Sequence, residues 1–327
     1  MQPLAGDCSL SDSLAGVPHM GLGAYGSLLL LGAIWGASFL LIKIGVAEMG
    51  PMTLAALRTA LGAVVLGVIL AARREPLSRN SRLWRRLALM AALGIAVPFA
   101  AISWGTQHIA SSLSAILNAA MPLFTFCIVA LSGGEATGLR RLVGVLLGLG
   151  GILILVLPQL LQGGVQATVL GQLAVVLAAL SYALAVVYAN RHLTNESPLH
   201  TSFGQLTLAA LMLAPLALFE DSWRAAITYR SIGAVAVLGV LGTALAYLVY
   251  YRLIRQAGAT FTSLVTYITP VFGVFWGRLI LNERLSWNAF AALGLILGGL
   301  LLVRGRPAAP KAAAPEGAAL AKARRSG

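Results

Sequence analysis

Ten apolar runs, each long enough for an α-helix to cross the hydrocarbon core of a bilayer, dominate this chain. They lack the period-two alternation of membrane-barrel strands. The composition agrees, because 59% of the 327 residues are hydrophobic and only 10% are charged, against about 25% charged in soluble domains. We therefore predict an all-α integral membrane protein with ten transmembrane helices. The runs lie near residues 24–46, 52–72, 87–106, 109–132, 142–160, 168–189, 202–219, 231–251, 257–280 and 286–303.

The distribution of Lys and Arg predicts the orientation of these helices. With the amino terminus inside, the outer connections hold only Arg224, Arg230, Arg278 and Arg284, and most of the 23 cations fall in the inner connections and the carboxyl tail. Cytoplasmic loops carry such an excess, so we expect both termini in the cytoplasm and the protein in a bacterial-type inner membrane. The same excess accounts for the net charge of +13, and no nucleic-acid partner is expected. Residues 1–23 and 305–327 are predicted to be disordered cytoplasmic tails.

The second half of the chain repeats the first. A shift of 148 residues places Pro122 on Pro270 and Glu135 on Glu283, and a shift of 147 places Trp35 on Tyr182. A near-constant offset across five spans indicates a duplication, with units at 24–160 and 168–304. Because each unit has an odd number of spans, the two must cross the membrane in opposite senses. Two inverted five-helix repeats are typical of transporters with a site near the middle of the membrane.

Two segments resemble a known family. WGASFLLIK followed by Pro and Arg, within Trp35 to Arg58, and YYRLIRQAGATFTSLVTYITPVFGVFWGRLILNERL, Tyr250 to Leu285, resemble the EamA family of the drug/metabolite transporter superfamily. The resemblance implies ten helices in two inverted units, and export or exchange of small metabolites, amino acids or drugs. The chain departs from its own repeat at one place: SGGEATG around Glu135 lacks the Arg that follows Glu283. We therefore do not assign to the loop around Glu135 any family role that requires the two halves to be alike.

Two prolines at equivalent positions, Pro122 and Pro270, lie inside predicted spans four and nine. A proline removes one helical hydrogen bond and frees a carbonyl, so each either opens polar backbone to a transport cavity or is a kink sealed by neighbouring helices. Polar residues precede both prolines by eight and four positions, along one helical face. They are Ser114, Asn118, Thr262 and Thr266.

Aromatic side chains are candidates for the wall of a substrate tunnel, since they present flat apolar surface with an occasional polar tip. The alternative is that these side chains are anchors at the membrane interface, and this interpretation applies best to Trp104. The candidates are Trp35, Phe99, Trp104, Tyr182, Tyr247 and Tyr267.

Two cations, Lys43 and Arg58, lie inside otherwise apolar sequence, where charge is costly unless it is paired or reaches an interface. Lys43 is about one turn from the outer end of span one, so we expect its stem to reach the interface. Arg58 lies deeper and needs a partner. Two interpretations remain open: a structural ion pair with Glu48 at the outer mouth, which we favour, or a cation that meets a substrate carboxylate.

The acidic residues all fall in tails or connections, so no span carries the central carboxylate of a proton relay. Glu135 and Glu283 come just before helices five and ten, where a carboxylate stabilises the positive end of a helix. We interpret both as structural rather than proton-coupling residues.

An embedded enzyme and a channel are the alternatives to a transporter. The four histidines are scattered, and HExxH, GxSxG and GxxxxGK[ST] are absent from the sequence, so we expect no enzyme activity, metal or cofactor. No filter-like polar loop indicates a channel. Glycines four residues apart, at 144–151 and 294–299, predict close packing inside the protein. The expected partners are therefore the lipid bilayer and a small-molecule substrate, with the protein a monomer or weak homodimer.

Overall fold

The computed structural model describes residues 22–78, 80–132, 138–193, 196–220 and 227–303, and contains no strand within these ranges. The first repeat supplies α1 (Leu22–Val46), α2 (Pro51–Ala72), α3 (Ser81–Ala91), α4 (Val97–His108), α5 (Ser111–Asn118), α6 (Met121–Leu131) and α7 (Leu139–Gly163). The second supplies α8 (Ala167–His192), α9 (Pro198–Leu218), α10 (Tyr229–Gly239), α11 (Ala246–Thr262), α12 (Val265–Leu281) and α13 (Trp287–Val303).

These helices join into ten membrane crossings, which confirms the predicted fold class. Eight helical stretches of the described residues are long and apolar enough to span a bilayer. Three of these combine shorter helices: α3 with α4, α5 with α6, and α10 with α11. The other two crossings, α12 and α13, are shorter apolar helices.

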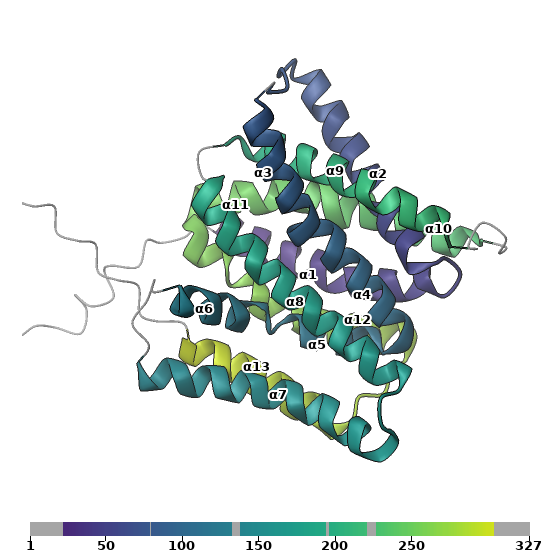
Figure 1. Cartoon of the computed structure of the whole chain (residues 1–327), viewed down its shortest axis with the longest axis vertical. Coiled ribbons are helices and arrows are strands. Elements are labelled where there is room, and N and C mark those ends of the chain that lie inside the picture. The colour runs from purple at the N-terminus through teal and green to yellow at the C-terminus, as the bar shows by residue number, and fades with distance from the viewer. Residues whose placement is uncertain (1–21, 79, 133–137, 194–195, 221–226, 304–327) are drawn as a thin grey trace, which may run out of the picture.

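Helices at equivalent places in the two repeats pack against each other (Figure 1). α2 lies along α9 with α3 beside them, and α7 lies along α13 at the opposite end of the bundle. α1 packs on α12, and α8 packs correspondingly on α5 and α6. The predicted close approach at the glycines is confirmed, because a Cβ on Gly144 would meet the carbonyl oxygen of Gly299. Each repeat is thus completed by the other.

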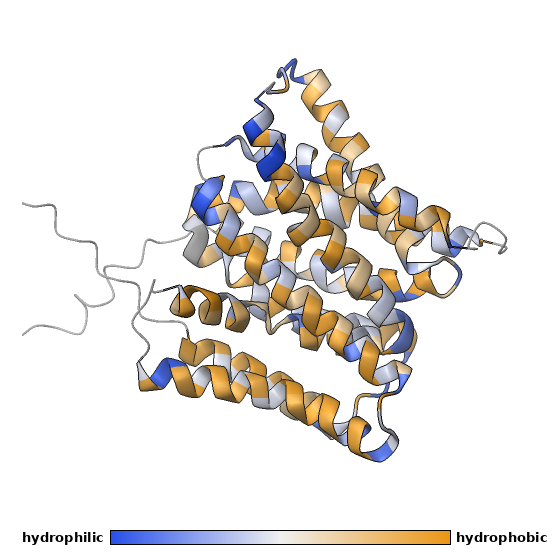
Figure 2. Ribbon diagram, in the orientation of Figure 1, coloured by the Kyte–Doolittle hydropathy of each residue, from blue (hydrophilic) through white to orange (hydrophobic). Residues whose placement is uncertain are grey.

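The outer surface of the bundle is apolar along its helices. Leu, Val and Phe side chains are exposed on every side, for example Val64, Val68 and Leu211, each more than 60% exposed. Figure 2 shows orange along the helices and blue at their ends and connections. Soluble proteins rarely expose apolar surface on this scale, so lipid is the solvent that this surface fits.

Each repeat contains one π-helical segment in its third crossing. η1 (Ala92–Ala96) lies between α3 and α4, and η3 (Val240–Leu245) lies between α10 and α11. The two segments begin 148 residues apart, which is the offset of the repeat. Such wide turns inside α-helices are frequent at functional sites.

The two prolines predicted to mark helix kinks have different surroundings. The fourth crossing does break, at Ala119 and Ala120, so that Pro122 stands in the first turn of α6, where a missing N–H costs nothing. Pro270, in contrast, lies within a continuous α12. In the second repeat the turn at Ser263 and Leu264, between α11 and α12, interrupts the ninth crossing before Pro270. Gly258, whose φ of 80° is readily adopted by glycine, corresponds at the repeat offset to Ala110, between the third and fourth crossings. The two halves therefore interrupt the helix at different places.

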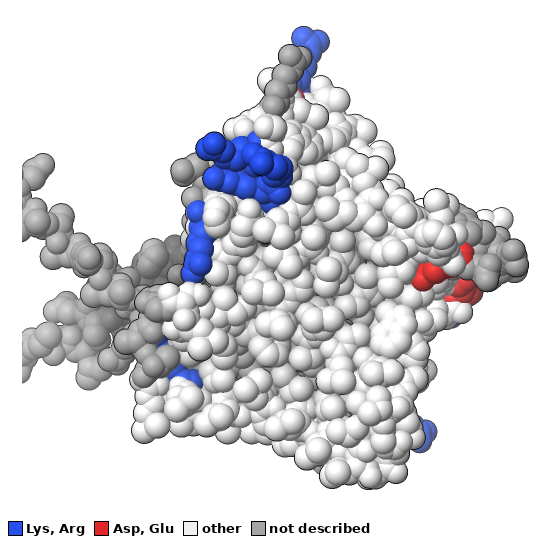
Figure 3. All heavy atoms as spheres, in the orientation of Figure 1, with Lys and Arg blue, Asp and Glu red and all other residues white. Residues whose placement is uncertain are grey.

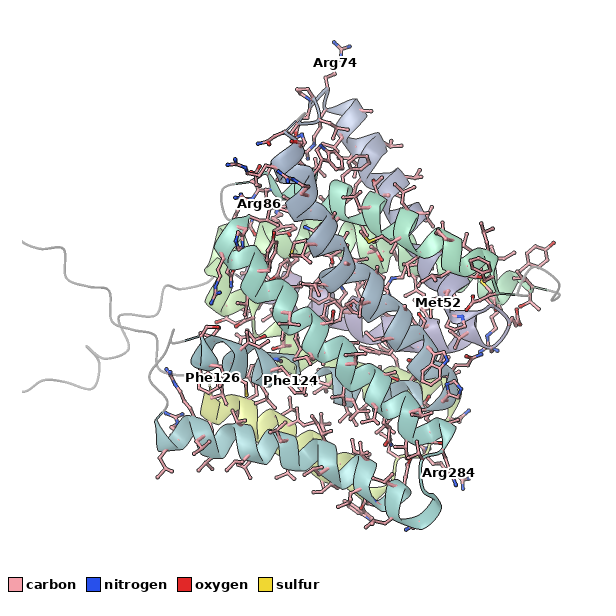
Figure 4. The ribbon with its side chains drawn as sticks, viewed as in Figure 1. Met52, Arg74, Arg86, Phe124, Phe126 and Arg284 are labelled. Carbon is pink, nitrogen blue, oxygen red and sulfur yellow. The ribbon has the colours of Figure 1, made fainter. Side chains whose placement is uncertain are left out.

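Charged side chains separate to two edges of the bundle. One edge, here called the basic edge, carries Arg73, Arg74, Arg82, Arg85, Arg86, Arg140, Arg141, Arg191, Arg252 and Arg255. The opposite edge, here called the acidic edge, carries Glu48, Glu220 and Glu283 with three arginines. Figure 3 shows the contrast on one face, with blue toward the left and top and red at the right. In Figure 4, Arg86 lies toward the left, whereas Met52 and Arg284 lie toward the right.

Candidate functional site

The guanidinium of Arg58 is buried among residues of both repeats. Arg58 comes from α2 and is only 6% exposed. Its Nε donates a hydrogen bond to Thr243 Oγ1 of η3 at 2.9 Å, and its Cζ lies 3.9 Å from the centre of the Phe99 ring of α4. A cation over an aromatic face is held by the ring quadrupole. The predicted pair with Glu48 is wrong, because the Glu48 carboxylate binds Thr228 instead.

Two tyrosines complete this group, which we call the Arg58 cluster: Arg58, Phe99, Tyr182, Thr243 and Tyr247. Tyr182 of α8 and Tyr247 of α11 lie close enough to interact electrostatically with the Arg58 guanidinium. Four of the five were candidates from the sequence alone, and the fold brings them together from α2, α4, α8 and α11. The cluster contains no acidic residue.

A chain of aromatic rings extends from the Arg58 cluster toward the basic end of α11. Tyr247 stacks near Tyr251 with ring centres 6.3 Å apart, and Tyr251 meets Tyr250 at 5.4 Å. Tyr250 in turn packs against Trp35 at 5.5 Å. Trp35 therefore joins the cluster through two other rings, not by contact with Arg58.

The π-helical segments connect the two repeats at this site. The Thr243 hydroxyl accepts from Arg58 and donates to the Leu238 carbonyl, five residues back, at 2.8 Å. In η1 the carbonyl of Leu93 accepts from Ser181 Oγ of α8 at 2.7 Å. Leu93 is five residues before Pro98, which has no N–H to give, so Ser181 supplies the missing donor. Each wide turn is thus bonded by a side chain of the other repeat.

The remaining polar candidates have separate surroundings. Ser114 shares a 2.9 Å hydrogen bond with Thr106 inside the α4–α5 hairpin. Thr266 donates to the Ser263 carbonyl at 2.8 Å in the turn before α12. Asn118 Oδ1 is buried without a hydrogen-bond partner in the described part of the chain. Tyr267 is half-buried in the first turn of α12.

Comparison with known proteins identifies the family to which this architecture belongs. The sequence model of the EamA-like transporter family matches residues 23–157 and again 169–305. The chain belongs to the EamA-like transporter family. The two matches coincide with the two repeats, and they cover both sides of the Arg58 cluster.

Relatives of this EamA-like transporter are named as transporters in distant bacteria. The uncharacterized transporter YoaV of Bacillus subtilis is 28% identical over 273 residues, or 83% of this chain and 91% of YoaV. The uncharacterized inner membrane transporter YedA of Escherichia coli K12 is 27% identical over 280 residues, which cover 85% of this chain and 90% of YedA. A solved crystal structure aligns with a TM-score of 0.61 at 20% identity, covering 86% of this chain and 96% of that one. That last likeness shows the fold.

Lys43 has a structural partner that the sequence did not predict. Rather than reaching the interface freely, its Nζ donates to the carbonyls of Thr106 at 2.8 Å, Gln107 at 3.3 Å and Ile109 at 2.8 Å. These carbonyls end α4, where a helix carries partial negative charge. The expectation of simple snorkelling is therefore wrong, while a structural role fits the geometry.

The three carboxylates of the acidic edge each bind the start of a helix in the other repeat. Glu283 accepts from the backbone N–H groups of Ser111 and Ser112, at 2.8 and 3.0 Å, and from both hydroxyls. Glu220 accepts from the N–H groups of Met52 and Thr53. Glu48 accepts from Thr228 before α10. A carboxylate at a helix start satisfies free N–H groups and matches the dipole, so these bonds join the two repeats at the acidic edge.

Glu283 has the helix-start role that the sequence predicted, but at α5 instead of the following α13. Its charge also lies close enough to Lys43 for an electrostatic interaction. Lys43 at the end of α4 and Glu283 at the start of α5 thus clamp the α4–α5 corner. The equivalent prediction for Glu135 falls outside the described residues.

Replacing Lys43 with Met is expected to destabilise the protein by about 1–2 kcal/mol, because three helix-end carbonyls lose a charged donor. Thermal unfolding in detergent measures the change as a lower midpoint. Lys43→Arg is the matched control and should retain most of the stability. An unchanged midpoint for Lys43→Met would contradict the capping role.

Acid is expected to loosen the contact between Glu48 and α10. Hydrogen bonds from Ser231 and Thr228 hold the pKa of the Glu48 carboxyl below its ordinary value of 4.5. Stability from this carboxylate is therefore present above pH 4.5 and is lost as the pH falls through the lowered pKa. Unfolding of Glu48→Gln should be less sensitive to acid than unfolding of the wild type. Equal pH dependence of the two proteins would show that Glu48 adds nothing.

Sequence reasoning missed Thr243, Ser181 and the two π-helical segments. One signal was available, because Leu93-Gly94 falls on Leu241-Gly242 at the repeat offset of 148. The hydrogen bonds themselves join residues 88 and 185 positions apart. No pattern in a single sequence predicts such pairs, because apolar spans can pack in several registers.

Proposed function

We propose that this EamA-like transporter is a secondary carrier that exports or exchanges small amphipathic metabolites, amino acids or drugs by alternating access. The observation that supports this most strongly is the Arg58 cluster, a buried polar group formed jointly by both repeats. Ionisable residues inside membrane spans are expensive and mark substrate or ion pathways. Inverted repeats that meet at such a site can rock around it.

The aromatic side chains give the site its second property. Phe99, Tyr182 and Tyr247 surround one cation with mostly apolar surface. A pocket that is apolar with few polar groups suits a solute with an apolar body and a charged or polar end. We assign substrate contact to these residues and, through the ring chain, to Trp35. Ser114, Asn118, Thr266 and Tyr267 remain proposals for the same pathway.

We further propose that the basic edge faces the cytoplasm, with both termini inside and the acidic edge outside an inner membrane. The excess of arginine on the basic edge supports this orientation. Alkaline phosphatase fused to the carboxyl end should be inactive in a bacterial host, whereas a fusion within the α7–α8 connection should be active. The reverse pattern would overturn the orientation. We expect a monomer or weak homodimer, which size-exclusion chromatography with light scattering measures.

Flux into proteoliposomes tests the transport function. The panel contains labelled amino acids, organic acids, nucleosides, sugars and cationic dyes, each measured with and without unlabelled solute inside the vesicles. A carrier gives saturable uptake that internal solute accelerates. Flux that never saturates would indicate a channel, and no flux with any compound would contradict the proposal.

A further inference from the structure

The guanidinium of Arg58 lacks an anionic partner in the described part of the chain. Its bonded neighbour Thr243 is neutral, and its aromatic neighbours Phe99, Tyr182 and Tyr247 are neutral as well. Arginine has five N–H donors in a planar fork, and the described residues accept a hydrogen bond only from Nε. A buried charge is normally paired with an opposite charge. In the described residues, therefore, no acid balances the charge of Arg58.

The acids that could reach the cluster from the acidic edge are already bound elsewhere. Glu48, Glu220 and Glu283 each hold backbone N–H groups at the start of a helix. The other cation that lies inside apolar sequence, Lys43, is likewise fixed by carbonyls at the end of α4. These four charged side chains are thus held at helix ends of the acidic edge, whereas the Arg58 guanidinium is buried inside the bundle with no acid beside it among the described residues.

Two different contacts set the orientation of the guanidinium, one at its edge and one on its face. The hydrogen bond from Nε to Thr243 fixes the fork in its plane, and the ring of Phe99 covers one of its faces. A fork held in this way suits bidentate pairing with a planar carboxylate. A single charge also matches a carboxylate better than a doubly charged phosphate, which would bring uncompensated charge into apolar surroundings.

We propose that Arg58 is the counter-charge for a carboxylate on the cargo, an inference that rests on the transport function proposed above. The cargo is an organic acid or zwitterion whose carboxylate meets the fork of Arg58 while its apolar body contacts Phe99, Tyr182 and Tyr247. Cationic solutes are disfavoured by the like charge. The empty carrier holds an uncompensated charge, so it reorients more slowly than the loaded one.

Binding to the purified full-length protein in detergent tests the pairing without any need for transport. The probes are acetate, hexanoate and phenylacetate, each compared with its neutral amide, and phenethylammonium as the cation. Midpoints of thermal unfolding at increasing probe concentration give half-saturating values. We expect at least one acid to bind roughly 10- to 100-fold more tightly than its amide, the range for a charge-assisted hydrogen bond.

The variants separate pairing from general charge effects. In Arg58→Gln the preference for acid over amide should fall to about one, whereas Arg85→Gln, the same change at an exposed position of the basic edge, should leave it unchanged. Arg58→Lys keeps the charge without the fork, and Thr243→Val keeps the fork without its Nε acceptor. Both should reduce the preference partly, and they serve if Arg58→Gln does not fold.

The outcomes distinguish this inference from the transport function. Equal binding of acids and amides, tighter binding of phenethylammonium, a preference that survives in Arg58→Gln, or no midpoint shift with any acid up to about 100 mM would each overturn the pairing. Saturable flux of neutral solutes together with any of those results would leave the transport function standing. Absence of flux with the whole panel would remove the transport function even if acids bind.

Discussion

Arg58→Gln is expected to reduce uptake of the best-transported carboxylate by about 30-fold or more, because truncating one member of a buried charge pair costs roughly 2–5 kcal/mol. The same change should leave the unfolding midpoint of the empty protein unchanged or raise it, since Arg58 has no anionic partner in the described residues and removing an unpaired buried charge relieves desolvation. Proteoliposome flux and thermal unfolding measure the two effects.

Exchange provides a second measurement on the same variant. Unlabelled carboxylate inside the vesicles should accelerate uptake by the wild type, because the loaded carrier returns without an unpaired charge. Arg58→Gln should lose most of this acceleration, and Arg85→Gln should keep it. A large loss of stability in Arg58→Gln with normal residual exchange would instead make Arg58 a structural residue.

Glu283→Gln is expected to open the acidic edge. The carboxylate accepts from two backbone N–H groups and two hydroxyls at the start of α5, and a hydrogen bond to a charged group makes a net contribution of about 1.5–3 kcal/mol. We expect the amides of Ser111 and Ser112 to exchange hydrogen at least about 10-fold faster, which corresponds to 1.4 kcal/mol. Hydrogen exchange with mass spectrometry measures this on the α4–α5 peptide.

Glu196→Gln is the matched control for the acidic edge. Glu196 lies at the opposite, basic edge in the α8–α9 connection, so the α4–α5 peptide should exchange as in the wild type. If Glu283→Gln also leaves exchange unchanged, the carboxylate does not hold the edge. Slower uptake of cargo with faster exchange would link the clamp to the transport cycle.

The membrane fold follows from the sequence because lipid imposes strict requirements on a chain. Within a bilayer every backbone polar group must be bonded internally, so apolar runs of about 20 residues become helices. The duplication was equally visible, since Pro122 and Pro270 keep their offset through apolar sequence. Both predictions depend on properties of local sequence. The different breaks of the two halves, at Ala119 and Ala120 and at Ser263 and Leu264, depend on packing and were not predicted.

Four of the five members of the Arg58 cluster were candidates from the sequence, but their arrangement was not predicted. Arg58 was recognisable because charge is rare inside spans. Phe99, Tyr182 and Tyr247 were recognisable because aromatic rings present flat apolar surface to a solute. The point at which these side chains meet was not predicted. Glu48 was assigned as the ion-pair partner of Arg58 because it is near in sequence. In the structure Glu48 binds Thr228, 180 positions away. A short acidic side chain at a helix end accepts hydrogen bonds from the free N–H groups that lie nearest to it in space.

By itself the sequence determined ten crossings, two inverted repeats and a family of transporters. The length of each apolar run and the constant offset between the two halves can both be read directly from the order of residues. Tertiary structure alone decided that Thr243 fixes Arg58 and that Ser181 completes the turn at Leu93. It also decided that the acids of the acidic edge are bound to helix starts, leaving a central cation without an acid beside it in the described residues. Those facts depend on which helices touch, and packing between apolar surfaces is set by the whole bundle.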